Sequence, residues 1–399
     1  MIPLRLSHFT CVSCLGHGLA ATLAALRDGR GGLAPCAFET VRDLDTWIGE
    51  VSGLEAVALA DALAGFDCRN NRLAEAGLRQ DGFAEAVAAA IVRYGRQRVG
   101  VLLGTSTAGI LQTEQAYRRR DPASGALPAD FIYRTTHNTY SVGDYVRTRF
   151  GLQGPAMVMS TACSSSAKVF ASAARMIAAG LIDAAIVGGV DSLCLTTLYG
   201  FNSLELLSKR PCRPYDAERD GISIGEAAAF ILLERAPAEI GDDDLLLLGA
   251  GESSDAHHMS SPHPDGLGAR LAMQAALDSA GLAADAIDYL NLHGTATPSN
   301  DAAEGKAVAG LFGARVACSS TKGATGHTLG AAGGLEAVIC ALALRHGFLP
   351  GGLNLERRDP DIGIDYLAAN RELAPRRLLS NSFGFGGSNC SLVLGRGVP

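Results

Sequence analysis

The sequence lacks the apolar and basic segments that would direct a chain to a membrane or to nucleic acid. Its longest apolar runs, at 86–92 and 245–251, fall short of the ~18 residues of a membrane span. No Lys/Arg-rich block stands out beyond 118–120, and the net charge is −7, so we expect neither nucleic acid nor a membrane as a partner. The first residues contain no apolar signal region, and the ten cysteines follow no disulfide-framework spacing. Both absences favour a cytoplasmic location.

Linkers and low-complexity segments are also missing from the 399 residues. What is present, 48% hydrophobic and 19% charged residues, is typical of a globular protein with a large core. The 48 glycines exceed the usual share of about 7% and indicate tight turns or close backbone approaches. At roughly 150 residues per domain, the length suggests two or three domains, or one large duplicated unit.

Apolar strands and Ala-rich helices alternate along the chain. In the first half, strands are expected within 96–107, 155–162 and 183–191, and a helix over 168–181. The run 183–191 has no polar alternation, so we expect it to be buried on both faces. The β-α-β order predicts a parallel central sheet with covering helices.

Two segments half a chain apart resemble each other. Residues 156–180 and 314–347 both run from an apolar strand through a Cys/Ser-containing polar stretch to an Ala/Gly-rich helix. The pair indicates a diverged internal duplication, with halves at 1–241 and 242–399. Two unrelated β-α units with similar composition are the alternative.

A cysteine stands at the first of these strand-to-helix junctions, in "STACSSSAK" (160–168). Unpaired N–H groups at a helix N-terminus stabilise a thiolate, so we expect the pKa of Cys163 to be lowered and the sulfur to act as a nucleophile. The same N–H groups can hold an oxyanion, and the small neighbours leave room for a substrate. A buried cysteine packed as a small hydrophobic residue is the alternative.

Four polar residues in the second half are candidate partners for this cysteine. His293 and His327 each lie in a Gly/Thr loop after an apolar strand, and active sites of α/β sheets collect at such strand ends. Lys322 lies in the same loop as His327. Glu336 follows on a helix that has almost no other polar residue, so it needs a partner.

Together these motifs resemble the β-ketoacyl-acyl-carrier-protein synthases, condensing enzymes of the thiolase fold. The resemblance rests on "STACSSSA", "HGTATPSND", "STKGATGHTLGAAGGLEA", "NSFGFGGSN" and "CRPYDAERDGISIGEAAAFILLE", and it covers nearly the whole chain. It implies an α/β thiolase-like fold in which two duplicated βαβαβ-type halves form five layers, α-β-α-β-α. It also implies an acyltransferase that joins an acyl group to malonyl-carrier protein with loss of carbon dioxide.

The resemblance assigns roles to individual residues. Cys163 would carry the acyl group, and its N–H and that of Phe385 would form the oxyanion hole. His293 and His327 would assist decarboxylation, Lys322 would orient them, and Glu336 would hold Lys322. Phe385 would also be a gate residue. The residues expected to bind the substrate are Ser260, Thr295, Thr297, Thr107 (near the end of the acyl pocket) and His258.

No metal or cofactor is expected apart from the phosphopantetheine arm that arrives on the carrier protein. Ser260 replaces a common threonine, and Asn300 replaces a usual glycine, which puts the local loop conformation in doubt. The segment 205–215 is shorter than in common fatty-acid enzymes, which suggests a specialised pathway such as an aryl polyene or a polyketide.

An acidic acyl carrier protein is the expected partner, and basic residues would meet it: Arg118, Arg119, Arg120, Lys209 and Arg210. The family implies a dimer, either a homodimer or a heterodimer with a related subunit. The strand at 183–191 or the one at 156–162 would form the dimer edge.

Three alternative functions share some of these sequence features. A thiolase would use coenzyme A and a second catalytic cysteine, for which Cys390 is placed near the right end. A non-catalytic chain-length subunit would lack the cysteine, and a cysteine hydrolase would not explain two histidines with a lysine. The CxxC at 11–14 and the His/Asp-rich stretch 255–266 are minority candidates for redox or metal sites.

Overall fold

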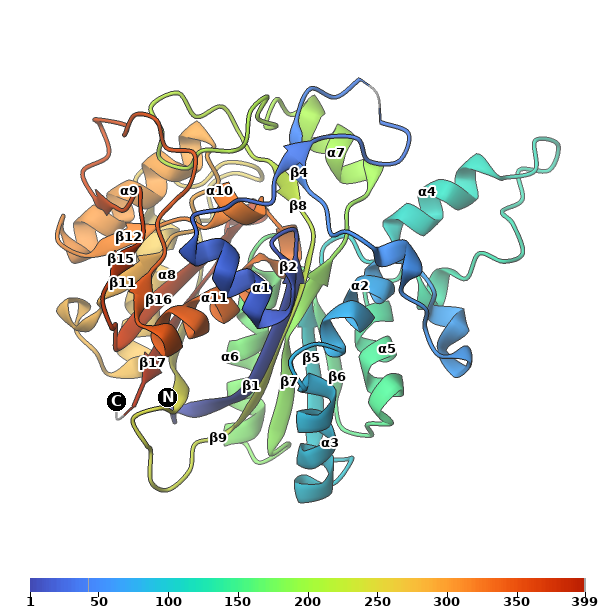
Figure 1. Ribbon diagram of the computed structural model, residues 1–399, viewed down its shortest axis with the longest axis horizontal. Coiled ribbons are helices and arrows are strands. Elements are labelled where there is room, and N and C mark those ends of the chain that lie inside the picture. Colours follow the sequence, from blue (N-terminus) through green and yellow to red (C-terminus); the bar gives the residue numbers. More distant parts are fainter. Residues whose placement is uncertain (42, 398–399) are drawn as a thin grey trace.

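The computed structural model describes residues 1–41 and 43–397, and its centre is one long sheet made of two half-sheets (Figure 1). The first half-sheet has the strand order β1 (Leu4–Ser13), β9 (Ala227–Arg235), β7 (Ala184–Asp191), β5 (Val99–Gly104) and β6 (Ala156–Met159). The second has the order β10 (Leu245–Ser254), β17 (Ser388–Arg396), β16 (Arg377–Gly384), β11 (Tyr289–Asn291), β12 (Ala317–Ser319) and β14 (Asp365–Tyr366). The two join where Leu4 and Arg5 of β1 pair with Leu247 and Leu246 of β10.

The two halves repeat one pattern of strand pairing. In the first, β5 runs parallel to β6 and β7, whereas β9 is antiparallel to β7 and β1. In the second, β11 runs parallel to β12 and β16, whereas β17 is antiparallel to β16 and β10. The repeat confirms the duplication. The prediction of a parallel central sheet is confirmed for the pairs that β5 and β11 make and is wrong for β9 and β17. Pairing direction was not visible because a strand buried on both faces is apolar whichever way its neighbours run.

Two helices lie between the half-sheets and others cover their outer faces (Figure 1). The central pair is α6 (Ser165–Ala178) and α11 (Ala332–His346), which pack against each other. The first half-sheet is covered by α2 (Arg69–Leu78), α3 (Phe83–Tyr94) and α5 (Ser141–Phe150), and the second by α8 (Leu267–Ala280) with α9 (Pro298–Phe312) beside it. The result is the expected α-β-α-β-α arrangement.

Shorter elements complete the described part of the chain. They are β2 (Gly16–His17), α1 (Gly18–Arg27), β3 (Ala34–Pro35), β4 (Trp47–Gly49), α4 (Ile110–Arg118), α7 (Leu195–Ser203), β8 (Ile224–Gly225), α10 (Lys322–Thr325), β13 (Phe348–Leu349) and β15 (Arg371–Glu372). The 3₁₀ turns are η1 (Leu54–Ala56), η2 (Asp61–Phe66), η3 (Tyr133–Thr135), η4 (Ala284–Ala286), η5 (Leu329–Ala331) and η6 (Phe385–Gly387). The exact division at residue 241 stays a prediction.

Two glycines, one in β5 and one in β7, allow α6 to pack closely on the ends of these strands. A Cβ at Gly104 of β5 would lie 2.3 Å from the backbone N of Ser166, and one at Gly189 of β7 would lie 2.6 Å from the Ser166 Cβ. Only glycine permits these approaches. The first turn of α6 therefore rests on the carboxyl ends of β5 and β7, which fixes the position of Cys163 just before it.

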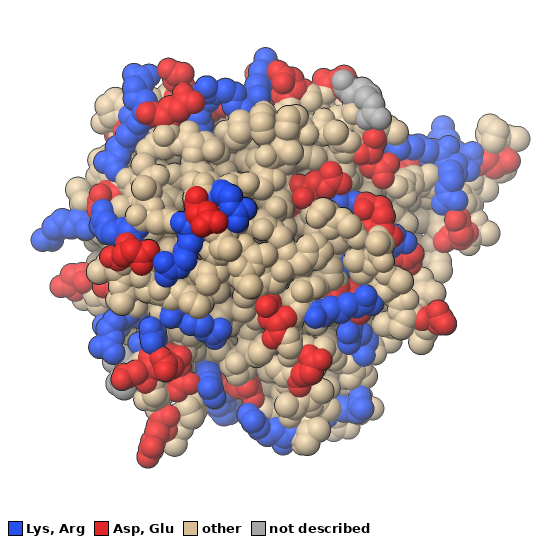
Figure 2. Space-filling model, viewed as in Figure 1, with Lys and Arg blue, Asp and Glu red and all other residues tan. Residues whose placement is uncertain are grey.

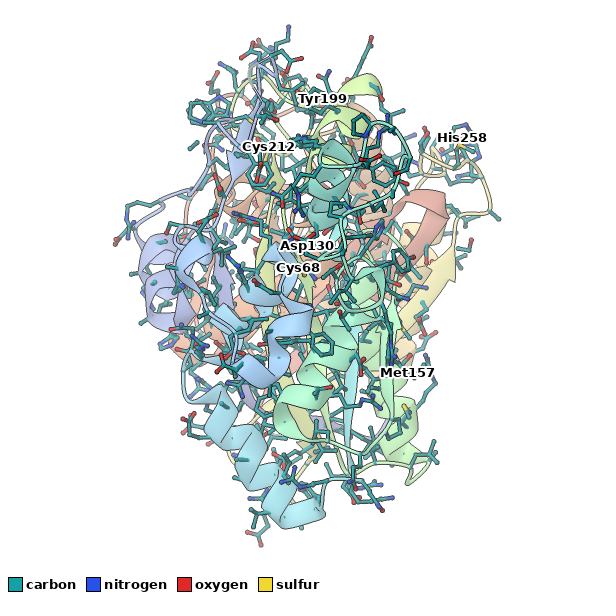
Figure 3. The ribbon with its side chains drawn as sticks, turned by 90° about the vertical axis from the view of Figure 1, so that its right-hand side faces the viewer. Cys68, Asp130, Met157, Tyr199, Cys212 and His258 are labelled. Carbon is teal, nitrogen blue, oxygen red and sulfur yellow. The ribbon has the colours of Figure 1, made fainter. Side chains whose placement is uncertain are left out.

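The edge of the first half-sheet is open. In the described part of the chain, β6 pairs only with β5, and its Met157 is 42% exposed (Figure 3). Strand β7 lies between β5 and β9, so the prediction that 183–191 could form a dimer edge is wrong. The other predicted strand, 156–162, contains β6, whose position at the edge of the sheet fits a dimer interface.

One helical stretch, Leu329–His346, is long and apolar enough to cross a membrane by length and composition. It comprises η5 and α11, and 89% of it is buried inside the protein. Its apolar character is therefore explained by its place between the two half-sheets.

Candidate active site

The cysteine of "STACSSSAK" lies on a tight turn between β6 and α6. Ala162 adopts a left-handed backbone with φ of 52°, which is uncommon for a residue with a side chain. Its carbonyl accepts hydrogen bonds from the N–H of Ser165 at 3.1 Å and the hydroxyl of Ser106 at 3.3 Å. This turn presents Cys163 at the start of α6, where its side chain faces the second half of the molecule.

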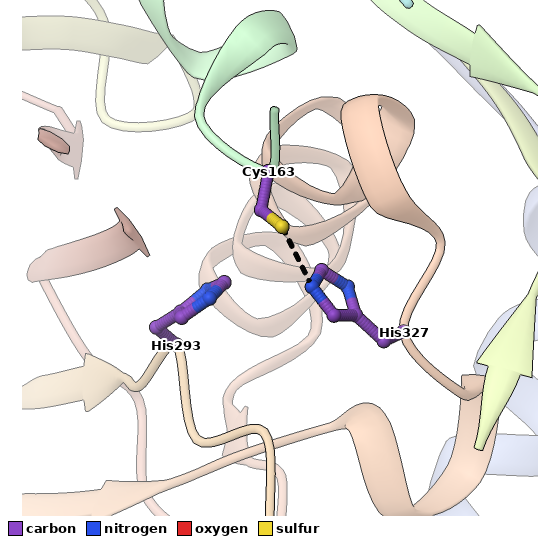
Figure 4. A group of neighbouring side chains, drawn as sticks. All are labelled: Cys163, His293 and His327. Carbon is purple, nitrogen blue, oxygen red and sulfur yellow. Dashed lines mark hydrogen bonds between the residues drawn. The ribbon is translucent and has the colours of Figure 1, made fainter. Parts of the chain in front are cut away.

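Two histidines from the second half meet Cys163 (Figure 4). Nε2 of His327 lies 3.0 Å from the Cys163 sulfur, and the His293 and His327 rings stand edge to face with centroids 5.3 Å apart. One ligand-type atom from each of the three residues lies within 4.8 Å of the other two. In the described residues this is the group whose spacing suits a metal ion, and the same spacing suits proton transfer and an oxyanion between the rings.

The pKa of Cys163 is raised, not lowered. Burial raises it to about 12, with smaller opposing effects from the positive charge of Lys322 and the Phe385 backbone N–H, and further raising effects from Asp191 and Glu336. The predicted lowering is wrong because the helix N-terminus does not offset the loss of water around the sulfur. The thiol therefore holds its proton at neutral pH, and Nε2 of His327 is placed to accept it.

Both histidines are held neutral. Burial lowers the pKa of His327 well below its usual value, and the charge of Lys322 adds to this effect. Burial, Lys322 and His327 do the same to the pKa of His293. A neutral imidazole can take up a proton or donate one hydrogen bond, which is what an acid–base pair needs.

Lys322 and Glu336 form a buried ion pair behind His293. The Lys322 ammonium donates to a Glu336 carboxylate oxygen and, at 2.6 Å, to the backbone carbonyl of His293. It also lies 3.5 Å from Nδ1 of His293. An ammonium only donates, so Nδ1 is the acceptor and the hydrogen of the neutral ring resides on Nε2. Burial raises the pKa of Glu336 to about 7, although Lys322 opposes the rise.

A pocket opens in front of these residues, and most of the predicted substrate-binding residues line it. Cys163, His293 and His327 share its wall with Ser260, Thr295, Thr297 and Asn300, and with the apolar side chains of Phe201, Leu206, Ile222 and Phe383. The Thr295 and Thr297 hydroxyls are 2.9 Å apart. Asn300 lies in the first turn of α9 and donates to Asp301 at 3.1 Å, so its replacement of glycine leaves the local helix intact.

Two predicted substrate-binding residues are elsewhere. Thr107 is buried beside Asp191, with its hydroxyl 2.8 Å from the carboxylate, and does not line the pocket. His258 is exposed on the loop 255–263, at the periphery in Figure 3, and its Nδ1 accepts from the Ser260 N–H at 3.2 Å. The sequence motifs place both residues near the site, but neither side chain lines the pocket.

Phe385 lies at the mouth of the pocket. The residue is 38% exposed, its ring lies 5.8 Å from that of Phe201, and its backbone N–H hydrogen-bonds to Cys163. Gly386 and Gly387 follow with φ of 81° and 76°, so the turn has the backbone freedom that a gate requires.

The five basic residues do not form one patch. Arg118, Arg119 and Arg120 lie at the end of α4, an arm that projects from the body in Figure 1 and carries the blue side chains at the far right of Figure 2. Lys209 and Arg210 are exposed on a separate loop, where Arg210 pairs with Glu356 at 3.2 Å. Arg119 likewise pairs with Asp130 at 2.9 Å.

The residues of the alternative redox, thiolase and metal sites do not come together in the structure. Cys11 is buried in β1 and bonds Thr22, while Cys14 faces the Thr325 carbonyl, so the CxxC forms neither a disulfide nor a metal group. Cys390 is buried in β17 and does not line the pocket. Among the described residues, no metal-sized cluster includes the histidines of 255–266.

Sequence reasoning missed the buried carboxylates that support the site. Glu304 accepts from the backbone N–H groups of His293 and Gly294, each at 2.8 Å, and Asp301 accepts from Thr295 at 3.0 Å. Their spacing of three residues, which places both on one face of the helix 298–312, was the available signal. The third buried carboxylate that the sequence did not single out is that of Asp191, at the end of β7.

Comparisons with known proteins agree with this geometry. Residues 9–238 match the N-terminal domain of the β-ketoacyl synthases, and residues 246–356 match the C-terminal domain. The chain is 34% identical over 412 aligned residues to 3-oxoacyl-[acyl-carrier-protein] synthase 2 of Coxiella burnetii, covering 96% of each chain. It is 40% identical to the synthase 2 of Rhizobium meliloti over 74% of each chain.

Solved structures resemble it over almost its full length. A chain of the complex between the ketosynthase ApeO and its chain length factor ApeC from Xenorhabdus doucetiae has a TM-score of 0.90 and 37% identity, covering 99% of this chain and 98% of that one. A β-ketoacyl synthase from Burkholderia phymatum has a TM-score of 0.88 and 29% identity, covering 99% and 100%. With its thiolase-like halves, its Cys-His-His centre and matches to both domains, the chain belongs to the β-ketoacyl synthase family.

Proposed function

We propose that the protein is a 3-oxoacyl-[acyl-carrier-protein] synthase that extends an acyl chain by decarboxylative condensation with malonyl-carrier protein. The observation that carries the proposal is the convergence of Cys163, His293 and His327 in one pocket, with Nε2 of His327 at 3.0 Å from the sulfur. A thiolase would need a second cysteine at this pocket, and a non-catalytic subunit would need no nucleophile.

In the first half-reaction, Cys163 takes the acyl group from the carrier. His327 accepts the thiol proton as the sulfur attacks the thioester carbonyl, and the oxyanion is held by the N–H groups of Cys163 and Phe385. The carbon–sulfur bond to the carrier breaks, and the carrier thiolate takes the proton. The products are acyl-Cys163 and free carrier thiol.

In the second half-reaction, malonyl-carrier protein loses carbon dioxide in the same pocket. The thioester oxygen gains the negative charge of the enolate and accepts hydrogen bonds from Nε2–H of His293 and from His327, whose neutral ring carries its hydrogen on Nε2 in this step. The enolate carbon attacks the acyl-Cys163 carbonyl, the carbon–sulfur bond breaks, and the Cys163 sulfur regains a proton. Overall, one acyl-carrier, one malonyl-carrier and one proton give a 3-oxoacyl-carrier, a free carrier and carbon dioxide.

The phosphopantetheine arm would be bound by hydroxyls in the pocket. Thr295, Thr297 and Ser260 line the wall that leads to Cys163, and Phe385 stands at its mouth. The arm brings its own thioester, so the protein needs no further cofactor for the reaction. Arg118 to Arg120, or Lys209 and Arg210, would meet the acidic carrier at the surface.

The assembly we propose pairs two related subunits through the open edge of β6. The partner is a second copy of this chain or a chain length factor such as the one in the ApeO–ApeC complex, and a specialised polyene or polyketide pathway is consistent with that similarity. A cytoplasmic location is the matching proposal for an enzyme that depends on soluble carrier proteins.

The test is intact-protein mass after mixing with a panel of acyl-carrier proteins. Wild type should gain the mass of one acyl group, Cys163→Ala should gain none, and Cys390→Ala should gain it like wild type. The donor that loads best identifies the chain class, and malonyl-carrier should then release carbon dioxide and the extended product. If no carrier-bound donor acylates the folded wild-type protein, the proposed function is wrong.

A further inference from the structure

A buried carboxylate with no counter-cation lies between the two loops that form the site. Asp191, at the end of β7, is fully buried, and none of the ion pairs among the described residues includes it. Burial raises its pKa, and hydrogen bonds from the segment 105–107 oppose the rise. Such a group is costly to bury, so its contacts indicate what it is retained for.

On one side, Asp191 binds the segment that supports the nucleophile. Its Oδ1 accepts from the hydroxyls of Thr105 and Thr107 at 2.7 and 2.8 Å, and from the N–H groups of Ser106 and Thr107 at 2.8 Å each. The Ser106 hydroxyl in turn donates to the carbonyl of Ala162, the left-handed residue before Cys163. The carboxylate thus braces the cysteine turn through one intermediate residue.

On the other side, Asp191 binds the loop of the catalytic base. Its Oδ2 accepts from the N–H of Gly330 at 2.5 Å, three residues after His327. A Cβ at Gly330 would lie 2.6 Å from this oxygen and 2.7 Å from the Ser106 nitrogen, so the loop approaches closely because residue 330 has no side chain. The carboxylate therefore connects the two halves at the level of the reacting atoms.

We propose that Asp191 is a positioning residue that holds the Cys163 turn and the His327 loop in register, so that His327 reaches the sulfur. The 3.0 Å contact between these side chains joins segments from different halves, and a shift of one ångström in either loop would break it. The negative charge carries a cost, because it opposes formation of the Cys163 thiolate. The proposal rests on the proposed function where its test measures the rate of acyl transfer. The alkylation of Cys163, which the same test measures, does not depend on that function.

The experiment compares wild type with Asp191→Asn and Asp191→Glu in the full-length protein. Acyl transfer from the best carrier donor should fall on the order of 10- to 100-fold in Asp191→Asn and recover in part in Asp191→Glu, which restores the acceptor. Site-resolved alkylation with iodoacetamide at pH 8 to 9 should change in the opposite direction. Asp191→Asn removes a charge that raises the pKa of Cys163, so more thiolate is present and Cys163 should react several-fold faster.

The groups that face the sulfur are otherwise unchanged in these variants: Lys322, Glu336, His293, His327 and the Phe385 N–H. Cys390, buried in β17, is the internal control and should alkylate as in wild type. A general opening of the structure would instead expose Cys163 and Cys390 together, and Asp191→Glu would not rescue acyl transfer. That result, or an unchanged acyl-transfer rate in Asp191→Asn, would overturn the proposal.

Thr107→Val keeps the charge and removes one of the hydrogen bonds, so it decides the matter if Asp191→Asn does not fold. It should slow acyl transfer several-fold and leave alkylation of Cys163 unchanged, whereas a wild-type rate would count against the positioning role. If wild-type protein accepts no acyl group at all, the proposed function fails, and the alkylation rates still report whether Asp191 acts on Cys163.

Discussion

The two halves share a strand order but connect their matching elements differently. In the first, β6 ends at Met159 and α6 begins at Ser165, so a tight turn carries Cys163. In the second, β12 ends at Ser319 and α11 begins at Ala332, and the longer connection holds α10, Lys322 and His327. One scaffold, used twice, thus supplies a nucleophile from a short connection and an acid–base group from a long one.

The difference between the two connections explains how a duplicated fold places its nucleophile and its acid–base groups in different halves. A short turn fixes one sulfur at the start of a helix, and a long loop can fold back so that its histidine meets that sulfur across the halves. The buried Lys322–Glu336 ion pair ties the long connection to α11 and so supports this loop from inside the protein. Each prediction below alters one side of this comparison.

The largest expected effect separates the two histidines. His327→Asn should slow both acylation of Cys163 and malonyl decarboxylation, because His327 contacts the sulfur and faces the enolate position; we expect losses on the order of 10²- to 10⁴-fold. His293→Asn should slow decarboxylation by a similar factor and leave acylation within a few-fold of wild type. Acyl-enzyme mass and carbon dioxide release measure the two steps. Equal loss of acylation in both variants would contradict this division.

Breaking the buried ion pair should lower stability. Lys322→Met leaves the Glu336 carboxylate buried without its cation, and we expect a loss of about 3–5 kcal/mol in the free energy of unfolding. Glu372→Gln, which breaks the exposed pair with Arg27, is the control and should cost under about 1 kcal/mol. Denaturant unfolding measures both. A loss as small as the control's would mean that water reaches Glu336 or that its carboxyl takes up a proton.

Acid should destabilise the protein through the two buried histidines of the second half. The pKa values of His293 and His327 are depressed in the folded state, so their contribution to stability is present above the unfolded pKa of about 6.5 and is lost as the pH falls toward the folded values. A variant with both replaced by Asn should show a flatter loss between pH 6.5 and 5, by up to about 1.4 kcal/mol per pH unit for each histidine. Glu336 titrates in both proteins and cancels. Identical slopes would be inconsistent with buried neutral rings.

The exposed strand edge of the first half should control assembly. Met157→Asp places a charge on β6 and should weaken the dimer at least about tenfold, whereas β12 of the second half is covered by β14. Leu181→Asp, at another exposed apolar residue, is the matched control and should leave the dimer intact. Sedimentation velocity over a concentration series measures this. Dissociation of the control and not of Met157→Asp would place the interface elsewhere.

The smallest expected effect concerns the carrier. Replacing Arg118, Arg119 and Arg120 with Glu should raise the KM for the carrier a few-fold at low salt, with kcat unchanged, and the effect should fade as ionic strength rises. The same change at Lys209 and Arg210 tells which of the two separated basic groups meets the carrier. Arg93→Gln, on α3, is the control. A salt-independent change would point to altered folding.

Much of the scaffold could be predicted because its signals are local. The segments around β5, β6, β7, β11, β12, α6 and α11 are apolar runs with clear ends, and the site residues stand at some of those ends: Cys163, His293, Lys322 and His327. Pairing direction could not be predicted, since buried strands look alike in either orientation. The pKa of Cys163 was predicted in the wrong direction because a sequence shows the helix start but not the depth of burial. Asp191 was missed because its partners come from both halves of the chain.

The halves touch along very little of the sheet, at two residue pairs between β1 and β10, and are otherwise united by α6, by α11 and by the loops around the site. Translation delivers α6 well before α11 leaves the ribosome. Until then, α6 covers only part of the inner face of the first half-sheet, and the part that α11 packs on, including β9, is left without its partner helix. The nucleophile is thus made early, but His293 and His327 arrive only with the last third of the polypeptide, so the site is assembled late in synthesis.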